Sequence, residues 1–231
     1  MTAPLLEYLR MFNAKERFFL VGYALDNPCF ALGEKFREDV GVALGLEVPA
    51  DAFCAMDYHL DWLYASLKLN ADEGKIKVYP NNDDIKAQQE DVDLLIAFQN
   101  NDVYHIIIIE AKCATGWTSS QMRSKAGRLK KIFGEEHAKG VKPHFVFLSP
   151  KKPNVRRLEE DLEKSEKWPP WMKIGEHEVN WLQLNPPKGH CLRSVSRCEK
   201  VDTGKKPKPC ANGHYWTMID RHVAKQAQQG K

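Results

Sequence analysis

Residues 91–112 read DVDLLIAFQNNDVYHIIIIEAK and carry the clearest structural signal in the chain. Two apolar segments, residues 91–98 and 103–112, flank the turn-like Gln99–Asp102, which predicts a β-hairpin. In the second segment Ile106–Ile109 are β-branched and apolar on both faces. Such a strand is typical of the centre of a sheet that is covered on both sides, so we expect an α/β fold built around it.

Segments with helical or strand patterns surround this hairpin. Residues 27–46 and 56–69 show the apolar spacing of amphipathic helices. Residues 75–80 predict a strand before the hairpin. Beyond the hairpin, residues 119–136 predict a helix and residues 144–150 a short buried strand. The predicted core therefore contains three strands, a helix and a fourth strand, preceded by helices.

The chain after the fourth predicted strand has a different composition, with proline-broken and lysine-rich stretches. We therefore expect two parts, a core with N-terminal helices over residues 1–150 and a basic peripheral elaboration packed on it over residues 151–231. Within the elaboration, residues 192–201 and 213–223 predict a β-hairpin around a lysine-rich loop.

Composition and charge restrict the class of protein. The 231 residues are 43% hydrophobic and 28% charged, as in a globular protein with a real core. No apolar run is long enough to span a membrane, the N-terminus does not resemble a secretory signal, and six dispersed cysteines suggest reduced thiols, so we expect a cytoplasmic protein. Residues 1–109 hold 9 basic and 18 acidic side chains, whereas residues 110–231 hold 25 and 13. This separation suits a basic face for a polyanion, with carboxylates grouped elsewhere.

Charged residues at one end of the predicted hairpin indicate chemistry. Glu110 and Lys112 are two residues apart on a strand and therefore project from the same face. Asp93 on the partner strand lies roughly opposite Glu110 if the turn is near residue 100. Carboxylates beside a core are costly unless they are compensated, and hard oxygen ligands suit Mg²⁺ or Mn²⁺.

This pattern resembles the PD-(D/E)xK nuclease superfamily, whose members have a restriction-endonuclease-like fold. In that family an acid on one strand is followed by (D/E)-x-K on the next, and here Asp93 is followed by Glu110-Ala111-Lys112. The resemblance covers about residues 28–150 and implies a three-layer α-β-β-β-α-β core with a central mixed sheet. Val92 stands where the family has proline, a departure that leaves the carboxylate in place.

The resemblance also implies roles for these residues. Asp93, Glu110 and the carbonyl of Ala111 would bind Mg²⁺ or Mn²⁺, while Lys112 would orient or deprotonate the attacking water. Many members add a glutamate from the first helix. Glu34 is the first choice here because it lies nearer the buried face of the predicted helix, and Glu38 is the second.

The helix after the motif carries three further candidates. Members of the family place a glutamine or lysine there, and Gln121 is the corresponding catalytic candidate. Lys125 and Arg128 follow Gln121 at helical spacing and would contact the DNA backbone, although the solvated face of an amphipathic helix has the same pattern.

The function implied by the resemblance is a metal-dependent deoxyribonuclease that hydrolyses phosphodiester bonds, with DNA as partner and a homodimer as one option. Two alternatives stay open from sequence. One is an inactive nucleic-acid-binding or scaffold protein of the same fold. The other is a zinc-stabilised DNA-binding module that uses Cys191, Cys198, Cys210 and His214. Zinc is disfavoured because the set lacks the paired C-x2-4-C spacing of structural zinc sites.

A third polar group, Asp57, His59 and Asp61, falls in the predicted helix 56–69. On a helix the two aspartates lie one turn apart and the histidine lies on the opposite side. We therefore expect a capping or DNA-facing role for these residues rather than a catalytic one.

Overall fold

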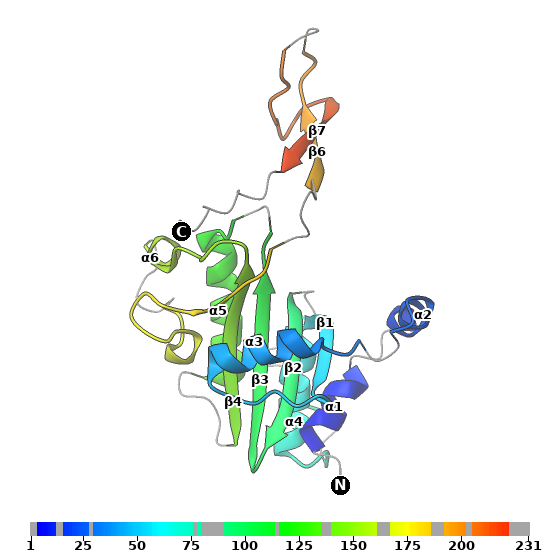
Figure 1. Cartoon of the computed structure of the whole chain (residues 1–231), viewed down its shortest axis with the longest axis vertical. Coiled ribbons are helices and arrows are strands. Elements are labelled where there is room, and N and C mark those ends of the chain that lie inside the picture. Colours follow the sequence, from blue (N-terminus) through cyan, green and yellow to red (C-terminus); the bar gives the residue numbers. More distant parts are fainter. Residues whose placement is uncertain are drawn as a thin grey trace.

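The structure, a computed structural model, is organised around a five-stranded mixed sheet with the strand order β1-β2-β3-β4-β5 (Figure 1). It describes residues 4–12, 16–27, 30–75, 78–79, 90–113, 116–134, 140–160, 167–185, 192–201 and 205–221. The elements are α1 (Pro4–Phe12), α2 (Glu16–Ala24), α3 (Glu34–Leu44), β1 (Phe53–His59), α4 (Leu60–Ala71), β2 (Asp91–Asn100), β3 (Val103–Ala111), α5 (Ser119–Phe133), β4 (Val141–Ser149), α6 (Val155–Glu159), the 3-10 helix η2 (Pro170–Met172), β5 (Asn180–Gln183), β6 (Leu192–Cys198) and β7 (Tyr215–Arg221).

The β2–β3 hairpin is confirmed. The two strands are antiparallel, with Asn100 opposite Val103 and Leu94 opposite Ile109. Asn101 in the two-residue turn has a φ of 52°, a left-handed conformation that asparagine tolerates better than most residues. The turn thus fixes the register, and the register determines which residues meet at the far end of the hairpin.

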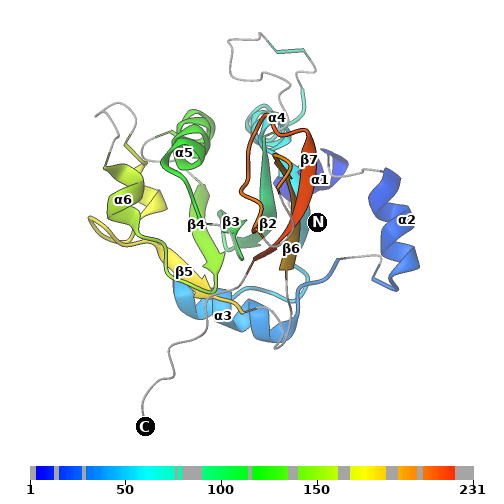
Figure 2. The same ribbon diagram turned by 90° about the horizontal axis from the view of Figure 1, so that it is seen from above.

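Strand β3 is central and covered on both faces, as its four isoleucines predict. Ile106 and Ile108 pack in a core with α1, α4 and α5, whereas Ile107 and Ile109 pack in a second core with α3. Figure 2 shows α4 and α5 on one side of the sheet and α3 on the other. Strand β4 lies parallel to β3 and β5 parallel to β4, so the sheet is mixed.

The first strand of the sheet lies elsewhere than predicted. Residues 53–59 form β1, antiparallel to β2, and α4 follows immediately, so the predicted helix over 56–69 is wrong for its first turn. Phe53 and Ala55 lie two residues apart on β1, and both are buried. This alternation is typical of a strand, and the prediction of a helix did not take it into account. The predicted strand at 75–80 lies partly outside the described residues, and its described residues 75, 78 and 79 are in no strand.

Helix α3 is shorter than the predicted helix over 27–46. It begins at Glu34, with Gly33 as the N-cap, and ends at Leu44, before the C-cap Gly45, whose φ of 65° suits a glycine. The predicted helix 119–136 is confirmed as α5, but it ends at Phe133, with Thr118 as its N-cap and Gly134 as its C-cap. The predicted strand 144–150 is confirmed as β4. Strand β4 begins three residues earlier than predicted, at Val141, and ends at Ser149.

The segment after residue 150, expected to be peripheral, contributes to the main sheet and core. Strand β5 pairs with β4, and Trp168, Met172 and Val179 are buried against the α5 side of the sheet. The indole Nε1 of Trp181 in β5 donates hydrogen bonds to the carbonyl oxygen and the Oγ of Ser149, at 3.2 and 3.0 Å. The end of β4 is therefore held in place by the fifth strand.

Strands β6 and β7 form the predicted antiparallel C-terminal hairpin, a separate two-stranded sheet. It extends beyond the end of the main sheet at which β3 terminates (Figure 1). One face of this hairpin carries Val195, Trp216 and Met218, whose exposed fractions are 70%, 69% and 62%. No helix within the described ranges is long and apolar enough to cross a membrane.

Candidate metal and phosphate site

Two carboxylates meet where β2 begins and β3 ends. One residue beyond the pair Leu94 and Ile109, the Oδ2 atom of Asp93 accepts a hydrogen bond of 2.6 Å from the backbone N–H of Ala111. Glu110 precedes Ala111 and projects to the α5 side of the sheet together with Ile106 and Ile108. The structure therefore brings Asp93 beside the Glu110-Ala111 segment, as the hairpin register predicts.

Glu110 is a buried carboxylate, with 10% of its side chain exposed. Burial raises the pKa of Glu110 to about 7, and the neighbouring Asp93 carboxylate adds to that rise. The Lys125 ammonium, whose Nζ lies 3.0 Å from Oε1, and Lys112 act in the opposite direction. Glu110 is thus poised between its neutral and ionised forms at physiological pH, and nearby cations favour ionisation.

The same carboxylate has unused capacity as a ligand. The contact of Oε1 with Lys125 lacks hydrogen-bond geometry, and this buried oxygen has no other hydrogen-bond partner among the described residues. Asp93 is exposed, and one hydrogen bond leaves further lone pairs on its carboxylate. Two carboxylates with free lone pairs at a partly open position suit Mg²⁺, which is held by one or two carboxylates together with water and phosphate oxygens.

Lys112 follows β3 on the same face as Glu110. Its backbone N–H donates to the carbonyl oxygen of Leu148 at 2.9 Å, which continues the β3–β4 pairing past the end of the strand. The side chain is half-buried and lines a pocket of about 610 Å³ between β3, β4, α5 and α6. The structure therefore places Lys112 between the carboxylates and this pocket.

Lys125 and Arg128 do not present free charges to a DNA backbone in this structure. Lys125 lies against Glu110 and also donates to the backbone carbonyl of Asp91. Arg128 forms an ion pair with Asp61 of α4, and only 10% of each side chain is exposed. The structure pairs both cations with the buried acids Glu110 and Asp61, and the DNA contacts of Lys125 and Arg128 stay a prediction.

The other three helix candidates are exposed residues. Gln121 is exposed in the first turn of α5, and its backbone N–H donates to Oγ1 of Thr118 at 3.3 Å. Glu34 and Glu38 are exposed on α3, which covers the opposite face of the sheet from the Glu110 side chain. Among the described contacts, none joins either glutamate to Asp93 or Glu110, so the structure does not assemble this part of the predicted site.

Asp57 is brought to the site region, which the helical reading of this segment missed. The β1–β2 pairs Met56 with Leu94 and Tyr58 with Val92 bracket it, so Asp57 lies across from Asp93. Its φ of 48° interrupts the regular strand there. The signal that could have located it is the strand alternation of Phe53 and Ala55 just upstream.

The neighbours of Asp57 have structural partners. His59 stacks on Trp62 with ring centroids 4.1 Å apart and lies 3.7 Å from Asp91. Asp61 pairs with Arg128 across α4 and α5. The group Asp57, His59 and Asp61 is therefore dispersed over a strand and a helix rather than gathered in one cluster.

The cysteine and histidine set is partly described. Cys198 is buried in β6, Cys210 is half-buried, and His214 is exposed, while Cys191 lies outside the described residues. The backbone N–H of Cys210 donates to the carbonyl oxygen of Arg197 at 2.9 Å. The described part of the chain holds no group of three or more His, Cys, Asp or Glu side chains arranged around a metal ion.

Comparison of the chain with protein-family models, with curated proteins and with solved structures finds no match. Any functional conclusion therefore depends on the residues and their arrangement.

Proposed function

We propose that this protein is a Mg²⁺-dependent deoxyribonuclease of the PD-(D/E)xK type. The observation that carries the proposal is the hydrogen bond between Asp93 and Ala111, since it holds the acid of one strand against the Glu110-Ala111-Lys112 end of the next. The order α3-β1-β2-β3-α5-β4 supports it, because it follows the α-β-β-β-α-β order of the restriction-endonuclease-like core, with α4 inserted between β1 and β2.

In this proposal Asp93, Glu110 and the carbonyl of Ala111 hold the metal ion. When bound, Mg²⁺ supplies a water of lowered pKa and neutralises charge that develops on the phosphate. Lys112 orients the attacking water and stabilises the charged phosphate, because it projects from the same face as Glu110. Lys125 keeps the buried Glu110 carboxylate available in its ionised form.

The basic second half of the chain would bind the DNA backbone. The C-terminal hairpin extends past the end of the sheet where Asp93 and Glu110 lie (Figure 1). It carries Lys206 and Lys208 in its loop and the exposed ring of Trp216. Cations that contact phosphates and an aromatic ring that stacks on bases are the usual elements of single-strand binding.

The test is cleavage of linear, nicked, single-stranded and branched DNA by wild type, E110Q, D93N and K112A, each with Mg²⁺, Mn²⁺ or EDTA. We expect metal-dependent cleavage by wild type and a loss of about 100-fold or more in each variant, since each removes a ligand or the cation at the reacting phosphate. K131A, which removes an exposed lysine of α5, serves as the matched control and should retain activity. Cleavage that persists in E110Q and K112A would exclude this site.

One observation favours a second function. Lys125 lies 3.0 Å from Glu110 and provides a cation for that carboxylate from within the chain. A protein of the same fold that binds nucleic acid without cutting it could keep this ion pair permanently. Under that alternative wild type binds the DNA substrates equally in Mg²⁺ and EDTA and cleaves none of them.

A further inference from the structure

The pocket beside Lys112 is strongly basic. Its volume is about 610 Å³, and four of its lining side chains are cationic: Lys112, Lys151, Lys152 and Arg157. No acidic residue is among the described residues that line it. Four positive charges around one concavity repel each other, so the pocket favours an anionic occupant.

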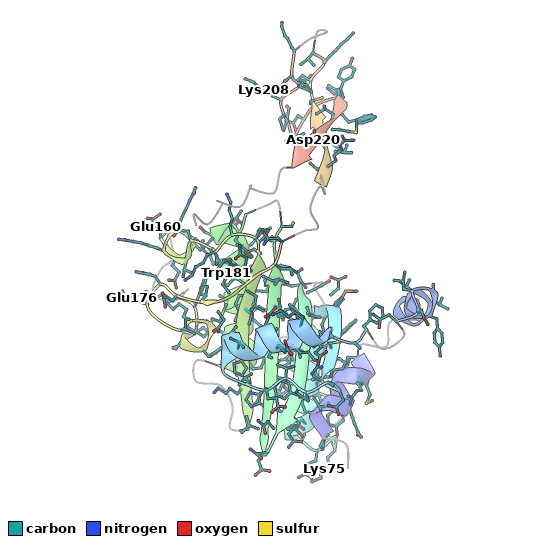
Figure 3. All side chains as sticks on the ribbon, viewed as in Figure 1. Lys75, Glu160, Glu176, Trp181, Lys208 and Asp220 are labelled. Atoms are coloured by element: carbon teal, nitrogen blue, oxygen red, sulfur yellow. The ribbon has the colours of Figure 1, made fainter. Side chains whose placement is uncertain are left out.

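The segment that carries two of these lysines is held to the core. Oγ of Ser149 donates to the carbonyl oxygen of Lys151 at 2.6 Å, and Nε2 of Gln183 in β5 donates to the carbonyl oxygen of Pro150 at 3.2 Å. Trp181, labelled in Figure 3, holds Ser149 itself. The backbone of Lys151 is therefore fixed before any ligand arrives, which lowers the entropic cost of binding.

The opposite wall is tied together in a similar way. Oδ1 of Asn154 accepts a hydrogen bond of 3.1 Å from the backbone N–H of Arg157, which orders the start of α6. Oγ of Ser119, at the start of α5, donates to the carbonyl oxygen of Arg157 at 3.4 Å. Arg157 is thus anchored to both helices through its backbone, and the residue is exposed and lines the pocket.

Three of the four pocket cations have no acidic partner among the described residues. Lys151, Lys152 and Arg157 are exposed, and within the described ranges none of them forms an ion pair with an acidic side chain. This distinguishes them from Lys125 and Arg128, which are paired with buried acids. The pocket cations are therefore available to a ligand.

Phosphate chemistry fits this lining better than other anions do. Lysine acts as a point charge toward phosphate, and the guanidinium fork of arginine matches two phosphate oxygens. A phosphate monoester carries nearly two negative charges at neutral pH and three acceptor oxygens, whereas each internal phosphodiester of a nucleic acid carries one charge. A pocket with four cations, three of them without an acidic partner, matches the monoester more closely.

We propose that this pocket binds the terminal phosphate monoester of the substrate strand. The inference rests on the proposed nuclease function, because Lys112 belongs to both the pocket and the candidate catalytic group. A strand whose phosphorylated end lies in the pocket would present an adjacent phosphodiester to Asp93 and Glu110. Cleavage would then be directed to the neighbourhood of strand ends.

The test is equilibrium binding of the full chain, in EDTA so that nothing is cut, to three otherwise identical labelled oligonucleotides. One carries a 5′-phosphate, one a 3′-phosphate, and one has hydroxyls at both ends. We expect one phosphorylated oligonucleotide to bind about tenfold more tightly than the hydroxyl-ended one, and the comparison of the two identifies the end that is recognised. Equal affinity for all three overturns the proposal, and this comparison needs no variant.

Variants then locate the effect. R157M and the double variant K151M/K152M should remove the preference for a phosphorylated end. R156M, which changes an exposed arginine of the same helix that does not line the pocket, should keep it. A preference that survives in R157M and K151M/K152M overturns the assignment to this pocket.

The two proposals fail in different ways. A phosphorylated-end preference in EDTA without any metal-dependent cleavage supports the pocket and rejects the nuclease. Mg²⁺-dependent cleavage whose rate and substrate affinity are the same for phosphorylated and hydroxyl-ended strands supports the nuclease proposal and rejects the proposed phosphate pocket.

Discussion

Lys125 has a position in the structure that its place on the helical wheel does not suggest. On a helical wheel it belongs to the polar side of α5, yet the folded chain places its ammonium against Glu110 and the carbonyl of Asp91. Pairing is what makes a charge tolerable at a position that is only 11% exposed. The lysine therefore favours the ionised form of the Glu110 carboxylate.

Replacing Lys125 by methionine tests this role. Without the ammonium, burial acts on Glu110 with less opposition, so the pKa of Glu110 rises further above its present value of about 7. Metal binding requires the ionised carboxylate, so we expect cleavage at pH 7 to fall about tenfold and to recover toward wild type at pH 9. A carboxyl ¹³C NMR titration should likewise give a higher pKa for Glu110 in K125M than in wild type. An unchanged pH profile in K125M would contradict this role, and K131M is the matched control.

A buried histidine pair offers a second residue-level prediction, at the other end of the sheet. Nδ1 of His105 and Nε2 of His144 are 3.0 Å apart, both residues are 8% exposed, and one ring nitrogen must donate to the other. Burial, with a contribution from the positive charge of Lys142, lowers the pKa of His105. The folded state therefore favours neutral His105, whereas the unfolded state takes up a proton near pH 6.5.

The stability supplied by this pair should consequently decline as the pH falls below about 6.5. At pH 7.5 we expect H105Q to be about 1 kcal/mol less stable than wild type, because it loses the buried hydrogen bond. At pH 5 the difference in unfolding free energy between H105Q and wild type should be smaller. At that pH protonation of residue 105 favours the unfolded state in wild type, and glutamine has no such proton to bind. Urea unfolding at both pH values measures this. H214Q changes an exposed histidine, so its stability relative to wild type should not depend on pH in this way. If the stability difference between H105Q and wild type instead grows toward low pH, the inferred effect of His105 is wrong.

At the scale of elements, two helical glycines illustrate how packing decides the effect of a methyl group. A Cβ on Gly41 of α3 would lie 2.6 Å from the carbonyl oxygen of Leu46, where the chain turns back on the end of the helix. A Cβ on Gly127 of α5 would meet nothing within 4 Å. The two positions share helical structure and differ in surroundings.

We therefore expect opposite results from alanine at these positions. G127A should stabilise the protein by roughly 0.5–1 kcal/mol, since glycine is a poor helix former. G41A should destabilise it by about 1–2 kcal/mol, because the backbone of Leu46 must shift. Urea midpoints of the two variants relative to wild type provide the measurement. If G41A is more stable than wild type, the backbone at Leu46 can shift to accept the added methyl group without loss of stability.

Elements whose pattern is local and strong were predictable from sequence. The β2–β3 hairpin follows from apolar runs around one turn, and the β6–β7 hairpin follows from a similar signal. Strand β1 was missed because its end and the start of α4 share the run MDYHLDWL, in which apolar residues also fit helical spacing. Strand β5 has only four residues, and its burial depends on β4, a partner that no local pattern reveals.

The candidate site was predictable in part for the same reason. Asp93, Glu110 and Lys112 lie on one hairpin, so turn position and strand periodicity suffice to bring them together. The inward turn of Lys125 and Arg128 depends on acids from β3 and α4, and such pairs between distant segments leave no periodic signal. The pocket formed by Lys151, Lys152 and Arg157 could not be predicted either, because the position of this segment depends on its contacts with β5.

At the scale of the whole molecule, the C-terminal hairpin stands apart from the core. Its strands contact each other more extensively than they contact the main sheet. Figure 3 shows Lys208 and Asp220 on this hairpin, well away from Trp181 in the core. One face pairs Val195 with Met218 and Arg197 with Trp216, and leaves large apolar side chains in solvent. Such a patch is typical of a binding surface.

Removing the charges of this hairpin should change DNA affinity without changing stability. For K206A/K208A we expect the slope of log K against log salt concentration to fall by roughly 2, one for each lost phosphate contact. W216A should weaken single-stranded DNA binding by about 1–3 kcal/mol if the ring stacks on a base. Fluorescence anisotropy over a salt series measures both. K131A/K167A is the charge-matched control on the core, and an unaltered salt slope in K206A/K208A would exclude the hairpin from the interface.

The central position of β3 also has a consequence for how the chain is made. Its antiparallel partner β2 precedes it directly, so the hairpin can close once residue 111 has been synthesised. Its parallel partner β4 is complete only at residue 149, after α5. Until then the isoleucine-rich strand presents an open edge of high β-propensity, the kind of segment that associates with other nascent chains. Pairing with β4 covers this edge, so completion of the sheet also removes a segment prone to aggregation.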